Sequence, residues 1–300
     1  MFKNMSPRAL GVSGRQSELL ELTLTYGFRG LDIDMADFQR RVARQGIDSA
    51  RRFIDSARVK VGGWDLPISW AGEEARYREE LKKLPSIAEI GAALGAKTAF
   101  THVPPASDSL PYHEHFELLR KRLAEIGDVF KPLGVKLAIG FQATPKAREG
   151  RQHEFIHQAE AFLLFLKAVG HDHIVALIDT WHWHVGGGTL QQIQGLSATQ
   201  IGMVRLADVP GDVDLAKITD RQRLLPTSEG KVNAATLLEW LDEKDYRGPV
   251  TPFPSSAQFQ GMTRDSIVQR TADALAEIWP GGPAPLVAPI PAGAGMDEME

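Results

Sequence analysis

The chain has 300 residues, a formal net charge of −4 and 43% hydrophobic residues. This composition fits a globular protein with a sizeable core, and it offers neither a basic surface for nucleic acid nor a polybasic patch for a membrane. With nine histidines and no cysteine, the chain excludes disulfides, thiol nucleophiles and cysteine-ligated zinc. The chain has no apolar signal segment near its start and no apolar stretch of membrane-spanning length, so we expect a cytoplasmic protein.

Short apolar runs alternate with longer segments of helical spacing along most of the chain. The predicted strands are residues 9–12, 30–33, 59–61, 98–102, 136–141, 174–178, 203–206 and 250–251, and the predicted helices are residues 35–57, 73–94, 112–130, 153–169, 234–244 and 263–278. This alternation predicts an α/β fold, namely a (β/α)8 TIM barrel formed by a single domain over residues 1–280. A doubly wound open sheet is the alternative, although residues 10–14 lack the GxGxxG pattern that its first turn usually carries.

The last residues, 281–300, differ in composition from the rest. They are rich in proline, alanine and glycine and end in acidic residues. Such a segment buries too little apolar surface to fold, so we expect a flexible C-terminal tail.

The clearest candidate site follows the sixth predicted strand. TIM barrels carry their chemistry at the carboxyl ends of the strands. There the chain reads Asp-Thr-Trp-His-Trp-His over residues 179–184, which brings a carboxylate, imidazoles and indoles together. A purely structural interpretation makes Asp179 a turn residue and the tryptophans core. We favour a site for a polar ring or polyol that includes Asp179, Trp181 and His182.

Other strand ends give weaker signals. Trp64 lies just after the third predicted strand, and His102 ends the fourth, where a lone histidine is more often a hydrogen-bonded core residue. Arg205 lies within an apolar strand. A buried arginine needs an anionic partner, and we expect Asp179, one strand earlier, to be that partner.

Residues 153–157 read His-Glu-Phe-Ile-His, which matches the HExxH zinc-protease pattern. The pattern requires a helix, and the segment is predicted to be helical. No third ligand is evident downstream, so a zinc hydrolase remains only a remote alternative.

Four strings resemble the xylose isomerase-like TIM-barrel superfamily, which includes sugar isomerases, epimerases, dehydratases and an endonuclease branch. They are GFRGLD at 27–32, DTWHWH at 179–184, DRQRLLP at 220–226 and YRGPV at 246–250, and the likeness extends over residues 9–280. The Asp-Thr-x-His and Asp-x-x-Arg-x-x-Pro strings are typical of the sugar-type branch. The resemblance therefore implies a TIM barrel with a carbohydrate-like ligand.

The resemblance also implies a divalent metal (Mn²⁺, Mg²⁺ or Zn²⁺) held by Glu, Asp, His and Glu at the ends of strands five to eight. In the family the two glutamates move a proton beside a carbonyl while the metal stabilises the enediolate. Asp179 falls on the aspartate ligand, and His182 falls on a histidine that contacts substrate. The other three ligand positions hold Gly140 with Gln142 nearby, Arg205, and Thr251 or Pro252. Because three of four ligands are replaced, we expect no metal or other cofactor, with Arg205 supplying the positive charge.

These features predict a sugar isomerase/epimerase-like enzyme that abstracts a proton from a small polyhydroxylated carbonyl compound without the usual metal. His182 is the predicted acid/base, Asp179 orients it, and Arg205 stabilises developing negative charge. The predicted substrate-binding residues are Trp64, His102, Gln142, Trp181 and Arg223. A non-catalytic sugar- or acid-binding barrel is the alternative, because both proton-moving glutamates are missing.

Overall fold

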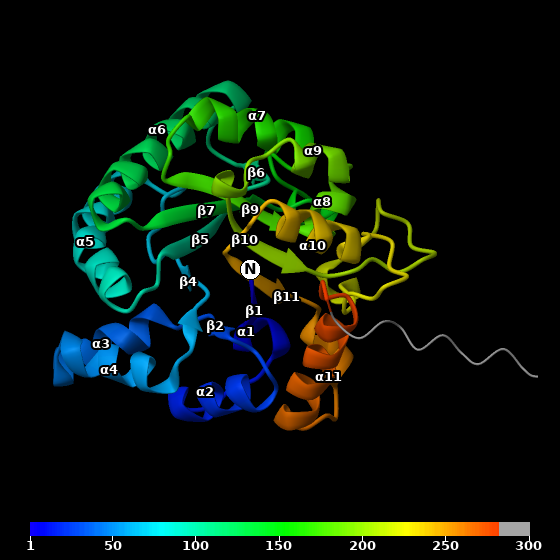
Figure 1. Cartoon of the computed structure of the whole chain (residues 1–300). Helices are drawn as coiled ribbons and strands as arrows, with labels where there is room; N and C mark the ends of the chain where they lie inside the picture. Colours follow the sequence, from blue (N-terminus) through cyan, green and yellow to red (C-terminus); the bar gives the residue numbers. More distant parts are fainter. Residues whose placement is uncertain (282–300) are drawn as a thin grey trace, which may run out of the picture.

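The computed structural model contains one parallel sheet that curls around a central axis, with helices packed outside it (Figure 1). The structure describes residues 1–281, so the predicted tail lies outside the described residues apart from Gly281. The strand order is β3-β2-β1-β11-β10-β9-β7-β5-β4. The strands are β1 (Phe2–Met5), β2 (Gly30–Leu31), β3 (Lys60–Val61), β4 (Trp64–Asp65), β5 (Thr98–Val103), β7 (Lys136–Phe141), β9 (Ile174–Asp179), β10 (Ile201–Leu206) and β11 (Pro249–Pro252).

Two glycines let one strand complete the barrel. β3 pairs with β2 and β4 pairs with β5, and only Gly62 and Gly63 separate these two halves. The two ends of the sheet are therefore parts of one continuous segment. A Cβ at Gly62 would overlap the Asn4 side chain, and one at Gly63 would lie 2.6 Å from Met203 Cε. Glycine is required here because the barrel interior is already filled. This topology confirms the predicted TIM barrel.

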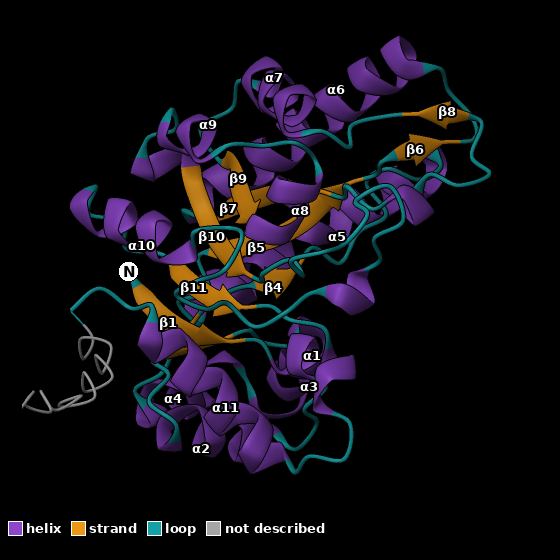
Figure 2. Cartoon of the chain, turned by 90° about the vertical axis from the view of Figure 1, so that its right-hand side faces the viewer, coloured by secondary structure: helices purple, strands orange, loops and turns teal. Residues whose placement is uncertain are grey.

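The helices cover the outer surface of the sheet, as Figures 1 and 2 show. They pack apolar side chains onto the outward faces of the strands and form one continuous core with them. The helices are α1 (Pro7–Leu10), α2 (Gln16–Thr25), α3 (Met35–Gln45), α4 (Ile47–Ala57), α5 (Glu74–Ala93), α6 (Tyr112–Phe130), α7 (Ala159–Val169), α8 (Thr180–Val185), α9 (Leu190–Gln194), α10 (Ala234–Glu243) and α11 (Arg264–Glu277). None of the helices among residues 1–281 is long and apolar enough to cross a membrane.

The predicted first strand, residues 9–12, is wrong. The strand is β1, which begins at Phe2, and residues 9 and 10 belong to the short helix α1. Pro7 starts this helix and Gly11, with φ of 67°, ends it. The sequence pattern missed this strand because Lys3 and Asn4 interrupt its apolar run. Asn4 occupies an interior barrel position where most strands carry an aliphatic residue.

The predicted helix over residues 35–57 is two helices. α3 ends and α4 begins at Gly46, whose φ of 78° breaks the helical path. Glycine adopts this conformation at little cost, so the chain turns there.

The HExxH segment is not helical. His153 and Glu154 form the short strand β8 (His153–Glu154), which pairs antiparallel with β6 (Ala106–Ser107), and the helix starts only at Ala159. β6 and β8 lie apart from the barrel strands (Figure 2). His157 is occupied by its own loop, since its Nδ1 lies 2.8 Å from the Phe155 carbonyl oxygen. The zincin geometry needs both histidines on one helix face, so the zinc hydrolase alternative is wrong.

Candidate active site

Four adjacent strands carry a row of buried polar side chains near their carboxyl ends. The register places Asp179 of β9 beside Arg205 of β10, and Arg205 beside Thr251 of β11. Asn4 of β1 continues the row, because its Nδ2 donates to Thr251 Oγ1 at 2.9 Å. All four side chains are buried. Parallel strands end on the same side of a barrel, so this row forms one wall of its mouth.

Asp179 is bound by Arg223, not by Arg205 as predicted. Arg223 Nη2 donates to Asp179 Oδ2 at 2.5 Å, and the two side chains are only 5% and 3% exposed. Arg223 lies in the loop between β10 and α10, where its Nε donates to the Phe253 carbonyl at 3.0 Å. Burial opposes ionisation of Asp179, but the Arg223 guanidinium outweighs it and holds the pKa of that carboxyl well below its usual value. The pairing inferred from adjacent strands is therefore wrong, because a loop residue takes the carboxylate.

His182 is held through both its backbone and its ring. Asp179 Oδ1 accepts a hydrogen bond from the His182 backbone N–H at 3.1 Å and so caps α8. The Ala143 N–H donates to His182 Nδ1 at 3.2 Å, which places the proton of the neutral ring on Nε2. Burial lowers the pKa of His182 to about 4. The imidazole is therefore a neutral N–H donor near pH 7, and Asp179 orients it through the helix cap.

Arg205 is buried between two aromatic rings. Its guanidinium carbon lies 4.3 Å from the Phe100 ring centroid and 4.2 Å from that of Phe253. Its Nε has no hydrogen-bond partner among the described residues. Burial lowers the pKa of Arg205, while the charges of Asp32 and then Asp179 counteract that effect. A buried guanidinium with an unused N–H is suited to bind an oxyanion.

Asp32 follows β2, which β1 and β11 separate from β10, and the charge of Arg205 acts on it. Asn4 Nδ2 donates to Asp32 Oδ1 at 2.8 Å, whereas Asp32 Oδ2 is buried without a partner among the described residues. Burial raises the pKa of Asp32 to about 6, although the charge of Arg205 and the hydrogen bond from Asn4 favour its charged form. The cost of burying the charged Asp32 carboxylate is therefore only partly offset by its protein partners.

Two predicted substrate-binding residues lie at the strand ends with part of their surface exposed. They are His102 of β5 and Gln142, which follows β7. The His102 ring centroid lies 6.3 Å from that of His182. Burial, followed by the charge of Arg205, lowers the pKa of His102 to about 3, so this imidazole is also neutral.

The two predicted tryptophans are fully buried. Trp64 Nε1 donates to the Ala96 carbonyl at 3.2 Å, which ties the ring to the core. The Trp181 ring lies 5.0 Å from the Arg223 guanidinium carbon and so supports the ion pair with Asp179. Their predicted part in shaping the pocket stays a prediction, and the contacts present act through packing.

Sequence reasoning missed Asn4, Asp32 and Asp220 as site residues. Asp220 Oδ1 lies 4.0 Å from His182 Nε2 and 3.8 Å from Arg223 Nη1. Asp32 and Asp220 stand within the strings GFRGLD and DRQRLLP, so their positions after a strand and before Arg223 were the available signals. Asn4 gave none, because its strand was not recognised.

The donor set does not fit the family's divalent metal. Among residues 1–281, no three His, Asp or Glu side chains converge to hold an ion. Both Asp179 oxygens already have donors, and two guanidinium groups lie where a cation would bind. A Cβ at Gly140 would lie 3.1 Å from the His102 ring and 3.2 Å from Leu177 Cδ2, so a glutamate there would have to displace neighbours.

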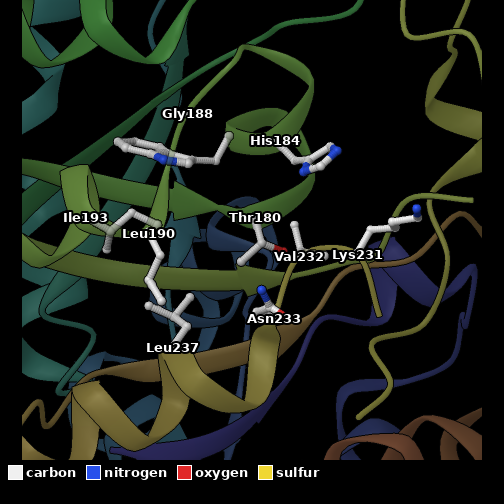
Figure 3. A pocket seen from close by; sticks show the side chains of 10 residues that line it. Thr180, His184, Gly188, Leu190, Ile193, Lys231, Val232, Asn233 and Leu237 are labelled. Carbon is white, nitrogen blue, oxygen red and sulfur yellow. The ribbon is translucent and has the colours of Figure 1, made fainter. Parts of the chain in front are cut away.

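A hollow lies beside this cluster, between α8, α9 and α10 (Figure 3). It has about 490 Å³ counting its open mouth, and Thr180, His184, Lys231 and Asn233 bring polar groups to it. A second hollow of about 370 Å³ lies among apolar side chains next to Asp32 and Phe38. Neither hollow includes Asp179, His182 or Arg205.

Comparison with known proteins gives a family and a fold. An inosose isomerase of Halalkalibacterium halodurans is 22% identical over 236 residues, which are 77% of this chain and 79% of the relative. A xylose isomerase domain protein from Alicyclobacillus acidocaldarius superposes with a TM-score of 0.82 at 22% identity, covering 93% of this chain and 98% of that one. The IOLI protein, solved with a zinc atom, gives a TM-score of 0.77 at 17% identity over 93% of this chain and 98% of that one. Residues 20–277 match the xylose isomerase-like TIM barrel family, and the chain therefore belongs to that family.

Proposed function

We propose that the protein is an isomerase that moves a proton next to the carbonyl group of a small polyhydroxylated ketone or aldehyde. The observation that carries this proposal is that a neutral N–H donor, His182, and a buried guanidinium, Arg205, both lie at the neighbouring ends of β9 and β10 at the barrel mouth. The sugar-isomerase character of the family and the inosose isomerase relative support a cyclic or open-chain polyol ketone as the substrate class.

The proposed chemistry follows from the charge that develops during proton abstraction. When a proton leaves the carbon beside a carbonyl, negative charge accumulates on the carbonyl oxygen. Arg205 and the His182 Nε2–H would stabilise that oxygen, and a buried site strengthens both interactions. In this proposal Arg205 supplies the positive charge that the family takes from a divalent metal.

Asp179 and Arg223 would position the donor instead of reacting. Asp179 caps the helix that carries His182, and Arg223 neutralises Asp179. In this proposal Arg223, which was predicted to bind substrate, is a positioning residue, and Asp179 orients His182 through the helix cap.

Proton exchange in heavy water tests the proposal. Proton NMR would follow deuterium incorporation into an inosose, D-fructose and dihydroxyacetone. We expect catalysed exchange with at least one of them, and Arg205→Met should lower that rate by about 10²–10³-fold through loss of oxyanion stabilisation. Lys231→Met, in the separate hollow of Figure 3, is the matched control and should retain the wild-type rate. Absence of exchange throughout the panel would contradict the proposal.

A non-catalytic binding barrel is the second candidate. It is favoured by the residues at the positions of the family's two glutamates, which are Gly140 and either Thr251 or Pro252. Calorimetric binding of an inosose without any deuterium exchange would support this candidate against the enzyme.

A further inference from the structure

The proposed reaction needs a base that removes the proton, and neither His182 nor Asp179 is free to act as one. His182 Nδ1 accepts from the Ala143 N–H, so its lone pair is already used. Asp179 has a donor at each oxygen. By the resemblance, the two positions that carry glutamates in the family hold Gly140 and either Thr251 or Pro252.

The remaining carboxylates near the strand ends differ in their solvent exposure and in their hydrogen-bond partners. Asp65 is 60% exposed and pairs with Arg8 at 3.2 Å, and Asp220 is 63% exposed. The buried Asp208 turns its Oδ1 to backbone, accepting from the Val209 N–H at 2.8 Å and from the Val232 N–H at 3.3 Å. Asp32 differs from these three because the oxygen atom Oδ2 is itself buried and has no donor among the described residues, although the residue as a whole is half-buried.

We propose that Asp32 is the base of this reaction, and that its free oxygen Oδ2 takes the substrate proton beside Arg205. The inference rests on the proposed function and names the residue that replaces the missing glutamates. Asn4 occupies Oδ1 from one side, which leaves Oδ2 as the oxygen for the reaction.

The step balances without a co-reactant. The bond between hydrogen and the carbon beside the carbonyl breaks, and the proton goes to Asp32 Oδ2. The electron pair of that bond forms a carbon–carbon double bond, while the carbonyl π pair moves onto the oxygen that Arg205 and His182 stabilise. The hydroxyl group on the neighbouring carbon then passes its proton to the former carbonyl oxygen, and the electron pair of that O–H bond forms the new carbonyl. The carbon–carbon π pair takes the proton back from Asp32, so that the former carbonyl carbon gains a C–H bond. One carboxylate serving both carbons gives isomerisation, since it delivers the proton on the face from which it took it.

The surroundings of Asp32 suit a base that works near neutral pH. Burial raises its pKa to about 6, while the charge of Arg205 on β10 and the hydrogen bond from Asn4 act in the opposite direction. Asp65 after β3 adds a smaller repulsion that also raises this pKa. A base is most effective when its pKa lies close to the working pH.

Glycines fix the position of this carboxylate through Asn4. A Cβ at Gly62 would overlap the Asn4 side chain, and a Cβ at Gly30 would lie 2.8 Å from Asn4 Oδ1. Asn4 therefore lies flat against two backbones, and its amide holds both Asp32 and Thr251. Such support fixes the geometry of a reacting group.

Deuterium exchange measured from pH 4.5 to 8.5 tests the assignment in the full chain. The wild-type rate should rise with pH through a midpoint near 6, because the charged carboxylate is the reactive form. Asp32→Asn should lose about 10²–10⁴-fold in rate, the usual contribution of a general base. Asp32→Glu should keep a rising limb at a reduced rate, because the carboxylate is retained but displaced.

Asp65→Asn is the matched control, since it removes a nearby exposed carboxylate. It should keep the rate and move the midpoint slightly down, because the repulsion that raises the pKa of Asp32 is gone. Asn4→Ala should move the midpoint up, because the charged carboxylate loses a hydrogen bond. Thermal melts would establish that each variant is folded.

The outcomes separate this inference from the proposed function. An Asp32→Asn variant that exchanges within threefold of wild type overturns the inference and leaves the proposed function standing. If Asp32→Asn does not fold, the midpoint of the pH–rate profile decides. A midpoint that moves in neither Asn4→Ala nor Asp65→Asn belongs to another group, and this result also overturns the inference. Wild-type protein without any exchange overturns the proposed function and the inference together.

Discussion

On the β9 side of the barrel mouth both oxygens of Asp179 have protein partners, whereas on the β2 side Asp32 has a partner among the described residues for one oxygen only. Asp179 forms an ion pair with the buried Arg223, while Asp32 feels the charge of the buried Arg205 without an ion pair among the described residues. Their pKa values move in opposite directions, because an ion pair at 2.5 Å outweighs burial at Asp179 and no such pair exists at Asp32. The satisfied side is a framework that positions His182, and the incompletely satisfied side is where a substrate group would bind.

The largest effect is expected from breaking the buried ion pair between Asp179 and Arg223. Asp179→Asn should lower the free energy of unfolding by about 3–5 kcal/mol, since it leaves the Arg223 charge buried without its partner. Urea unfolding at pH 7 measures this. Wild-type stability from this pair should be complete above the unfolded carboxyl pKa of about 3.9 and fall as pH drops below it, because the pKa of Asp179 is lowered in the folded protein.

An exposed pair supplies the control for that variant. Arg8→Ala removes the pair with Asp65, in which both side chains are mostly exposed, and should cost at most about 1 kcal/mol. Equal losses for Asp179→Asn and Arg8→Ala would contradict the difference between buried and exposed pairs.

The next largest effect is expected from displacing Asn4, the side chain that holds Asp32. Gly62→Ala should lower the free energy of unfolding by about 1–3 kcal/mol, because the added methyl group forces Asn4 to move. The exchange rate should fall as well, since Asn4 holds Asp32. Gly211→Ala is the matched control: the nearest atom to its Cβ would be Lys231 Cε at 4.0 Å, so stability and rate should stay at wild-type values. A Gly62→Ala protein as active as wild type would show that Asn4 does not position Asp32.

A smaller effect of opposite sign is expected from Asp32 itself. Its folded pKa of about 6 lies above the unfolded value, so the folded state gains stability from the protonated carboxyl below about pH 4 and loses it as pH rises through 6. Asp32→Asn carries no charge and escapes that loss, so it should be more stable than wild type by about 1–2 kcal/mol at pH 8. Urea unfolding at pH 4 and pH 8 measures the difference, which should disappear at the lower pH.

Removal of metal ions is expected to leave the deuterium exchange rate unchanged. If Arg205 supplies the positive charge, dialysis against EDTA should leave the exchange rate within twofold of its starting value, and added Mn²⁺ or Zn²⁺ should not raise it. Loss of exchange on chelation with recovery on metal addition would contradict the metal-free reaction.

Much of the fold could be predicted because apolar strands and helical spacing repeat through the chain. The same pattern placed Asp179 and Arg205 correctly at neighbouring strand ends. It failed at β1, whose residue Asn4 fills an interior position with a polar side chain, and at His153, where a short strand precedes the helix.

The arrangement of the site was less accessible to sequence reasoning. Strand order shows that Asp179 and Arg205 are neighbours, but no periodicity shows that the loop after β10 brings Arg223 back to the carboxylate. Asp32 follows a two-residue strand, so it reads as an ordinary turn residue. Its unusual state depends on burial and on the free oxygen Oδ2, which only the packed structure shows.

The contrast between the two carboxylates is tested most directly by one pair of unfolding free energies, those of Asp179→Asn and Asp32→Asn measured in urea at pH 8 against wild type. The account predicts opposite signs: Asp179→Asn is less stable than wild type and Asp32→Asn is more stable. If both variants lose stability, or both gain it, the division of the barrel mouth into a satisfied framework and an incompletely satisfied reactive side is contradicted.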